Sequence, residues 1–290
     1  MQTTSLAFEA IGTHWQIDIP QDTSPMHRDY FLNEIVTVIE DFDKTYSRFR
    51  IDSLVTQIFQ KKGTYRLPDN AQELFRLYRE LYDITNHAVT PLIGQVLVEA
   101  GYDATYSLKP KKLHKPPQWD DVIDYNYPNL TVKKPALLDF GAAGKGYLID
   151  LVAEVLKKHN LAYFCVDAGG DMSYYNTGNE KLRVGLEHPD NPKEIIGIVE
   201  IHNQSICGSA GNRRKWGEFH HIIDPETLSS VHKVKAVWVV AETGLLADGI
   251  ATCLFFTPAK KLLKKYNFSY TLIYENNSIE FSKDFPAKIF

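Results

Sequence analysis

Apolar side chains recur every three or four residues in several stretches of this 290-residue chain. From Met26 to Tyr46, for example, Phe31, Ile35 and Phe42 fall on one face, as they do in an amphipathic helix. The same spacing predicts helices at 26–46, 70–86, 91–100, 145–159, 244–256 and 258–266.

Other stretches alternate apolar and polar residues or run continuously apolar, which predicts strands. Residues 5–19 alternate, with Gly12-Thr13 as a bulge or turn, and residues 161–167 form the apolar run of a buried strand. Further strands are expected at 136–140, 181–187, 195–202, 234–241 and 269–274.

Helices and strands mix without a regular β-α-β period, so the sequence predicts an α+β fold with mixed or antiparallel sheets and packed helices. Residues 1–290 are expected to form a single domain. Residues 102–135, which are rich in Pro, Lys, Asp and Tyr, are expected to form a surface excursion.

The composition excludes several classes of protein. It is 44% hydrophobic and 23% charged with a net charge of −4, and no long Lys/Arg run marks a nucleic-acid partner. No apolar stretch approaches the roughly 20 residues of a transmembrane segment. With no signal peptide at the N-terminus, the sequence as it stands is expected in the cytoplasm, although removal of a leader would leave the same chain. The isolated cysteines are expected to be buried free thiols.

Two glycine-containing segments carry candidate chemistry. The segment Leu138–Gly146 places small residues between an expected strand and an expected helix, where the backbone can approach a ligand closely. The helix N-terminus and Lys145 favour a phosphate there, and a tight helix-start turn with a surface lysine is the alternative. In Val166–Asp171, two aspartates flank Gly-Gly. Their carboxylates could hold a metal or a ribose, but capping of the turn is favoured.

Two further segments contain histidine or hydroxyl groups. His220 and His221 are adjacent in an expected strand and point to opposite faces, so at most one faces a given pocket, and for His220 a structural role is preferred. Asp248 and Thr252 lie one helical turn apart, so both oxygens point the same way. A carboxylate and a hydroxyl suit Mg²⁺ better than zinc, and an N-cap Asp with a back-bonded Thr is the alternative.

Together these segments resemble the motifs of the ApbE-type FAD:protein FMN transferases. The family's LDxGxxxKGYxxD is similar to Leu138–Asp150, and its VDxGGD to Val166–Asp171. Its SHxIDPxT is similar to His220–Thr227, and its LADxxATxLF to Leu246–Phe255. Weaker similarities precede them at 11–13, 47–53 and 88–94, so the resemblance covers almost the whole chain.

The resemblance implies a two-lobed α+β fold with the flavin site between the lobes. It implies Mg²⁺ ligands at Asp248, Thr252 and the backbone carbonyl of Ala142, and an active-site histidine at His221, with His221 or Asp248 helping to remove the acceptor's proton. The implied FAD contacts are Ile11, Phe49, Ala88, Val89, Thr90, Asp139, Lys145 and Ile223.

The function implied is Mg²⁺-dependent transfer of FMN from FAD to a Thr or Ser hydroxyl of an acceptor flavoprotein, with release of AMP. The alternatives are a Mg²⁺-dependent FAD pyrophosphatase and a flavin-binding protein without catalysis. The chain departs from the family pattern at Thr90, where Asp is usual, at Phe59, where Asn is frequent, and at Leu228, where Gly is usual. The lipobox of the lipoprotein members is absent.

Overall fold

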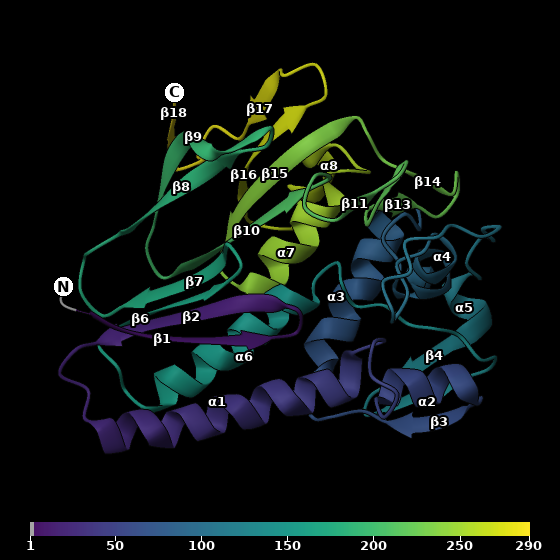
Figure 1. Cartoon of the computed structure of the whole chain (residues 1–290), viewed down its shortest axis with the longest axis horizontal. Helices are drawn as coiled ribbons and strands as arrows, with labels where there is room; N and C mark the ends of the chain where they lie inside the picture. Colours follow the sequence, from purple (N-terminus) through teal and green to yellow (C-terminus); the bar gives the residue numbers. More distant parts are fainter. Residues whose placement is uncertain (1–2) are drawn as a thin grey trace.

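The computed structural model describes residues 3–290 and shows two lobes (Figure 1). The helices are α1 Pro25–Tyr46, α2 Leu54–Gln60, α3 Ala71–Ile84, the 3₁₀ helix η1 Pro91–Ile93, α4 Gly94–Glu99, α5 Trp119–Val122, α6 Gly144–Lys158, α7 Gly244–Cys253 and α8 Ala259–Leu262. The strands are β1 Thr3–Ala10, β2 Thr13–Pro20, β3 Gly63–Arg66, β4 Ile123–Asn126, β5 Asn129–Val132, β6 Tyr163–Ala168, β7 Asp171–Asn176, β8 Leu182–His188, β9 Asn191–Ile201, β10 Gln204–Ala210, β11 Lys215–Trp216, β12 Phe219–His220, β13 Ile223–Asp224, β14 Ser229–Ser230, β15 Val234–Ala241, β16 Ser269–Tyr274, β17 Ile279–Phe281 and β18 Ala287–Ile289.

An eight-stranded sheet organises the larger lobe. Its order is β1-β2-β6-β7-β10-β15-β16-β17, and every neighbouring pair is antiparallel. Alternate side chains point to opposite faces, so Val166 and Cys207 join the main core with α6 and α7, whereas Cys165 and Ile206 face the small sheet β18-β9-β8. The predicted α+β class with antiparallel sheets is therefore confirmed.

The smaller lobe contains α2, α3 and α5 beside the sheet β3-β5-β4 (Figure 1). Helix α4 belongs to a separate cluster, in which Val96 and Leu97 pack with Trp216 and Ile223. This arrangement corrects part of the expected surface excursion. Residues 103–118 are largely exposed and lack helix or strand, as expected, but Trp119 and Leu130 are buried in the main core. The expectation was wrong for 119–132 because isolated apolar residues among polar ones do not reveal that they pack against α3.

Most predicted elements are present, and the exceptions have physical causes. The turn expected within residues 5–19 lies one residue earlier than predicted, because Ile11 and Gly12 both adopt positive φ (44° and 74°) and reverse the chain between β1 and β2. Residues 136–140 are not a strand. Asp139 donates its backbone N–H to the carbonyl of Pro91 at 2.7 Å, and no ladder of paired residues accompanies this bond. The helix expected at 258–266 is shortened to α8.

Helices α6 and α7 cross at their N-termini through two glycines. A Cβ on Gly146 would lie 2.1 Å from the carbonyl oxygen of Gly244, and a Cβ on Gly244 would lie 2.5 Å from that of Gly146. Each helix also receives a carboxylate from the other. Asp248 accepts a bond from the Gly146 N–H at 2.9 Å, and Asp150 accepts bonds from the Gly244 and Leu245 N–H groups at 2.7 Å each. The crossing brings Asp248 next to the Gly-rich loop before α6.

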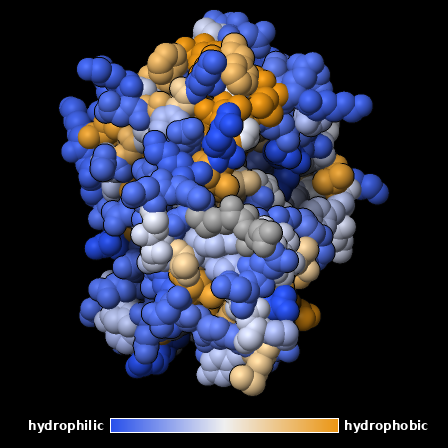
Figure 2. All heavy atoms as spheres, turned by 90° about the vertical axis from the view of Figure 1, so that its left-hand side faces the viewer, coloured by the Kyte–Doolittle hydropathy of each residue, from blue (hydrophilic) through white to orange (hydrophobic). Residues whose placement is uncertain are grey.

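The face that carries the N-terminal hairpin is mainly hydrophilic, with apolar side chains gathered at one end (Figure 2). Exposed apolar residues near the small sheet include Ile195 of β9 and Phe290 after β18. Within residues 3–290, no helix is long and apolar enough to cross a membrane.

Candidate active site between the two lobes

A cavity of about 850 Å³ lies where the lobes meet. Its size falls in the upper part of the range of about 300–1,000 Å³ typical of small-molecule sites. Every residue named above as an FAD contact, metal ligand or active-site histidine lines it: Ile11, Phe49, Ala88, Val89, Thr90, Asp139, Ala142, Lys145, His221, Ile223, Asp248 and Thr252. Residues separated by most of the chain are thus brought to one space.

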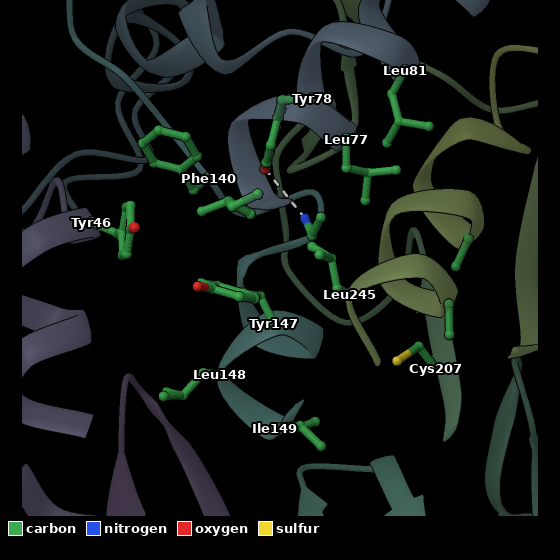
Figure 3. Packing of buried hydrophobic residues seen from close by; sticks show 14 of the residues in the cluster. Tyr46, Leu77, Tyr78, Leu81, Phe140, Tyr147, Leu148, Ile149, Cys207 and Leu245 are labelled. Atoms are coloured by element: carbon green, nitrogen blue, oxygen red, sulfur yellow. Dashed lines mark hydrogen bonds between the residues drawn. The ribbon is translucent and has the colours of Figure 1, made fainter. Parts of the chain in front are cut away.

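The loop that precedes α6, residues 139–143, is anchored by Tyr78 of α3. The hydroxyl of Tyr78 accepts a bond from the Ala143 N–H at 3.2 Å, shown by the dashed line in Figure 3. Phe140 packs edge-on against the Tyr78 ring, with centroids 5.3 Å apart. Asp139 accepts a bond from the Gly141 N–H at 2.8 Å through Oδ1. These contacts fix the loop's backbone against a rigid helix, so the carbonyl of Ala142 has a defined position.

The hydroxyl of Thr252 meets that carbonyl. Thr252 Oγ1 donates to the Ala142 oxygen at 3.1 Å rather than back-bonding within α7. Asp248 is buried in the middle of α7, whose N-cap is Thr243. The alternative of an N-cap Asp with a back-bonded Thr is therefore wrong, because both side chains reach across to the loop and to α6.

The charges around Asp248 favour a cation. Burial raises the pKa of Asp248 to about 7, helped by the charge of Asp171 and opposed by Lys145 and the Gly146 N–H. Removing this carboxyl group from water disfavours its charged form, and a cation beside it would restore that form. Three hard oxygen donors at this point therefore fit Mg²⁺.

Lys145 is held by the carboxylate of Asp171, for which the sequence had favoured a turn-capping role. Its Nζ lies 2.6 Å from Asp171 Oδ2, and Asp171 Oδ1 accepts a bond from the Gly208 N–H at 2.8 Å. Burial alone would lower the pKa of Lys145, but the neighbouring carboxylates of Asp171 and Asp248 outweigh it and raise the pKa. Lys145 is therefore a fixed cation in the cavity wall. The turn prediction holds for Asp167, which accepts a bond from the Gly170 N–H.

The two histidines have different surroundings, as predicted, although His221 lies just after β12 rather than within a strand. His220 is tied to the neighbouring loop, with Nε2 3.0 Å from the Val231 carbonyl oxygen and Nδ1 accepting from the Ile222 N–H. His221 instead lines the cavity, and its Nδ1 has no hydrogen-bond partner among the described residues. Burial, with a contribution from the charge of Arg214, lowers the pKa of His221 to about 3. The ring is therefore neutral near pH 7 and faces the cavity with an unpartnered Nδ1.

The remaining expected contacts form the other walls. Ile11 stands at the tip of the β1–β2 hairpin, and Phe49 lies just after α1. Thr90 caps η1, where its hydroxyl accepts a bond from the Leu92 N–H. Phe59 is 42% exposed on α2 and is not among the residues that line the cavity.

Arg48 is a cavity residue that the sequence did not single out. Its side chain is 2% exposed, its Nε lies 2.5 Å from Asp139 Oδ2, and its Nη1 donates to the Tyr102 carbonyl at 2.8 Å. The guanidinium carbon also lies 4.1 Å from the Phe49 ring centroid. The spacing to Asp139 along the chain offered no signal, although an arginine beside an expected contact residue could have been considered.

Comparison with known proteins agrees with this geometry. A family model described as the ApbE family matches residues 11–271. A FAD:protein FMN transferase of Haemophilus influenzae is 23% identical to this chain, over 90% of this chain and 82% of its own length. A FAD:protein FMN transferase of Buchnera aphidicola is 24% identical, over 96% of this chain and 87% of its own length. The crystal structure of an ApbE protein from Thermotoga maritima superposes with a TM-score of 0.83 at 19% identity over 97% of each chain. The flavin transferase ApbE of Vibrio cholerae gives 0.79 at 18% identity, over 97% of this chain and 96% of that one. The chain therefore belongs to the ApbE family.

Proposed function

We propose that this protein is a Mg²⁺-dependent FAD:protein FMN transferase that moves FMN from FAD to a Thr or Ser hydroxyl of an acceptor flavoprotein. The observation that carries the proposal is the meeting of Asp248, Thr252 and the Ala142 carbonyl beside Lys145 in one cavity. The relatives' names as FAD:protein FMN transferases support the same reaction.

The residues present fit a magnesium ion. Among residues 3–290, no three His, Cys, Asp or Glu side chains are grouped to hold a metal. A carboxylate, a hydroxyl and a carbonyl leave positions for phosphate oxygens and water, which is how Mg²⁺ is usually bound in phosphoryl-transfer sites. When bound, the ion would neutralise charge on the diphosphate.

The chain's own groups would supply the remaining chemistry. Lys145, fixed by Asp171, would place a positive charge against the diphosphate. Asp248 is assigned to the metal, so His221 would take the proton from the acceptor hydroxyl. The acceptor oxygen forms a bond to the FMN phosphorus, the bond from that phosphorus to the bridging oxygen breaks, and AMP leaves with that oxygen.

The test uses variants at the proposed metal site. Asp248→Asn keeps an acceptor for the Gly146 N–H but removes the charge, and we expect it to abolish AMP release from FAD with Mg²⁺ present. Asp29, an exposed aspartate in α1, provides a matched control, and Asp29→Asn should retain full activity. Full AMP release by Asp248→Asn, with unchanged Mg²⁺ dependence, would contradict the metal assignment.

A second assay separates transfer from hydrolysis. The protein is incubated with FAD and Mg²⁺, with and without a co-purified candidate acceptor, and covalent FMN on the acceptor is measured by mass spectrometry. Rapid acceptor-independent formation of FMN and AMP would favour the pyrophosphatase, and FAD that stays intact would favour a non-catalytic binding protein.

A further inference from the structure

Tyr106 presents an aromatic ring at the cavity from a loop that carries no family motif. The ring lines the cavity and the residue is 54% exposed. It stacks on Phe49 with centroids 5.6 Å apart and planes 8° from parallel. A single exposed tyrosine is ordinary, but one stacked parallel on a second cavity-lining ring forms a flat aromatic surface.

The surface is rigid on its inner side. The Arg48 guanidinium lies against the Phe49 ring at 4.1 Å, and Arg48 is itself fixed by Asp139 and the Tyr102 carbonyl. Tyr102 also packs edge-on against both Phe49 and Tyr106, with centroids 5.5 Å away in each case. Phe49 thus contacts both the buried Arg48 and the exposed Tyr106.

The backbone that carries Tyr106 is also fixed. Asp103 accepts bonds from the N–H groups of Thr105 and Ser107 at 2.9 and 3.0 Å, and its carbonyl accepts one from the Tyr106 N–H at 3.0 Å. Tyr106 adopts φ of +51°, a conformation that side chains other than glycine rarely take. The surrounding hydrogen bonds hold this conformation, and such strain is concentrated at ligand sites in proteins.

We propose that Tyr106 is a ligand-binding residue whose ring stacks on a planar heteroaromatic ring of the bound molecule. This inference rests on the proposed function, under which FAD supplies two such rings, the flavin and the adenine. Each aromatic ring has a negative face and a positive edge, so two stacked rings attract each other beyond the contribution of the apolar area that they bury. The phenol oxygen is not needed for this role.

The test measures binding of riboflavin, AMP and FAD separately to Tyr106→Leu and Tyr106→Phe by titration calorimetry. Tyr30→Leu is the matched control, because Tyr30 is 61% exposed on α1 and is not among the residues that line the cavity. We expect Tyr106→Leu to weaken FAD binding by about twofold to tenfold, the range for one aromatic pair. Tyr106→Phe and Tyr30→Leu should bind as the unmodified protein does.

The separate ligands identify the ring. A loss confined to riboflavin supports stacking on the flavin, and a loss confined to AMP supports stacking on the adenine. Unchanged binding of all three ligands by Tyr106→Leu overturns the inference while leaving the proposed function intact. An unmodified protein that binds neither riboflavin nor FAD overturns both. Because Tyr106 is exposed, its variants should keep the thermal stability of the unmodified protein, which the same samples verify.

Discussion

Replacing Gly146 with alanine tests the crossing that positions the proposed metal site. The added Cβ would lie 2.1 Å from the Gly244 carbonyl oxygen and 2.7 Å from Asp248 Cβ, whereas ordinary contacts begin near 3.4 Å. The nearest atom is backbone, so no flexible side chain can give way. Helices α6 and α7 would have to separate by about 1 Å or more at this point.

The energetic cost follows from three contributions. Overpacking a well-filled contact costs about 1–3 kcal/mol. Separation of the helices would also lengthen the 2.9 Å bond from Gly146 N to Asp248, and a hydrogen bond to a charged group contributes about 1.5–3 kcal/mol. The higher helix propensity of alanine returns about 1 kcal/mol. We expect a net loss of about 1.5–5 kcal/mol in the free energy of unfolding.

Chemical denaturation of Gly146→Ala against Gly144→Ala measures this loss. Gly144 begins the same helix, but a Cβ there would meet Phe140 Cβ and Phe42 Cζ at 3.5 Å, which is ordinary contact. Gly144→Ala should therefore stay within about 0.5 kcal/mol of the unmodified protein. Equal stability of the two variants would refute the argument that direct contact between the glycine backbones sets the position of Asp248.

Three further predictions concern buried groups. Burial lowers the pKa of His221 to about 3, so between about pH 3 and 6.5 the unfolded chain binds a proton that the folded protein does not. The free energy of unfolding should therefore fall as the pH drops below about 6.5, by about 2 kcal/mol at pH 5. In chemical denaturation measured against pH, His221→Asn should remove this fall. Arg48→Leu should cost about 3 kcal/mol in thermal or urea unfolding by leaving Asp139 without its partner, and Asp139→Asn in the same chain should recover part of the loss. Burial raises the pKa of each cysteine thiol, to about 12 for Cys165. A thiol reagent should therefore react with Cys165, Cys207 and Cys253 only after denaturant is added. Rapid labelling of the folded protein would contradict the burial of these thiols.

Periodicity was sufficient for the long elements. The segment Pro25–Tyr46 repeats its apolar positions at helical spacing and is capped by the hydroxyl of Ser24, so the sequence alone located α1. Residues 136–140 show the limit of this reasoning. Their apolar run suits a strand, but whether a strand forms depends on a neighbour with free backbone groups, and here the Asp139 N–H meets only Pro91.

Some residues of the candidate site were likewise predictable from the sequence, and others were not. The pairing of Asp248 with Thr252 follows from helical spacing. Strand alternation correctly predicted a structural role for His220, although His221 lies just outside β12. Arg48 and Tyr106 were not found, because each is defined by partners distant in sequence or by a turn conformation. No local pattern shows that Arg48 will lie against Asp139.

By itself, the sequence determined which segments are helical, which face of each is apolar, and which residues carry oxygen, amine and imidazole groups suited to a phosphate and a hard cation. These are local properties, because they depend on spacing along one segment. Only the tertiary structure decided that Ala142, Lys145, His221 and Asp248 share one cavity, and that Arg48 and Asp171 hold two of its charged groups in place. Those contacts join elements far apart in the chain, and they depend on packing, such as the glycine crossing of α6 and α7, that no single segment specifies.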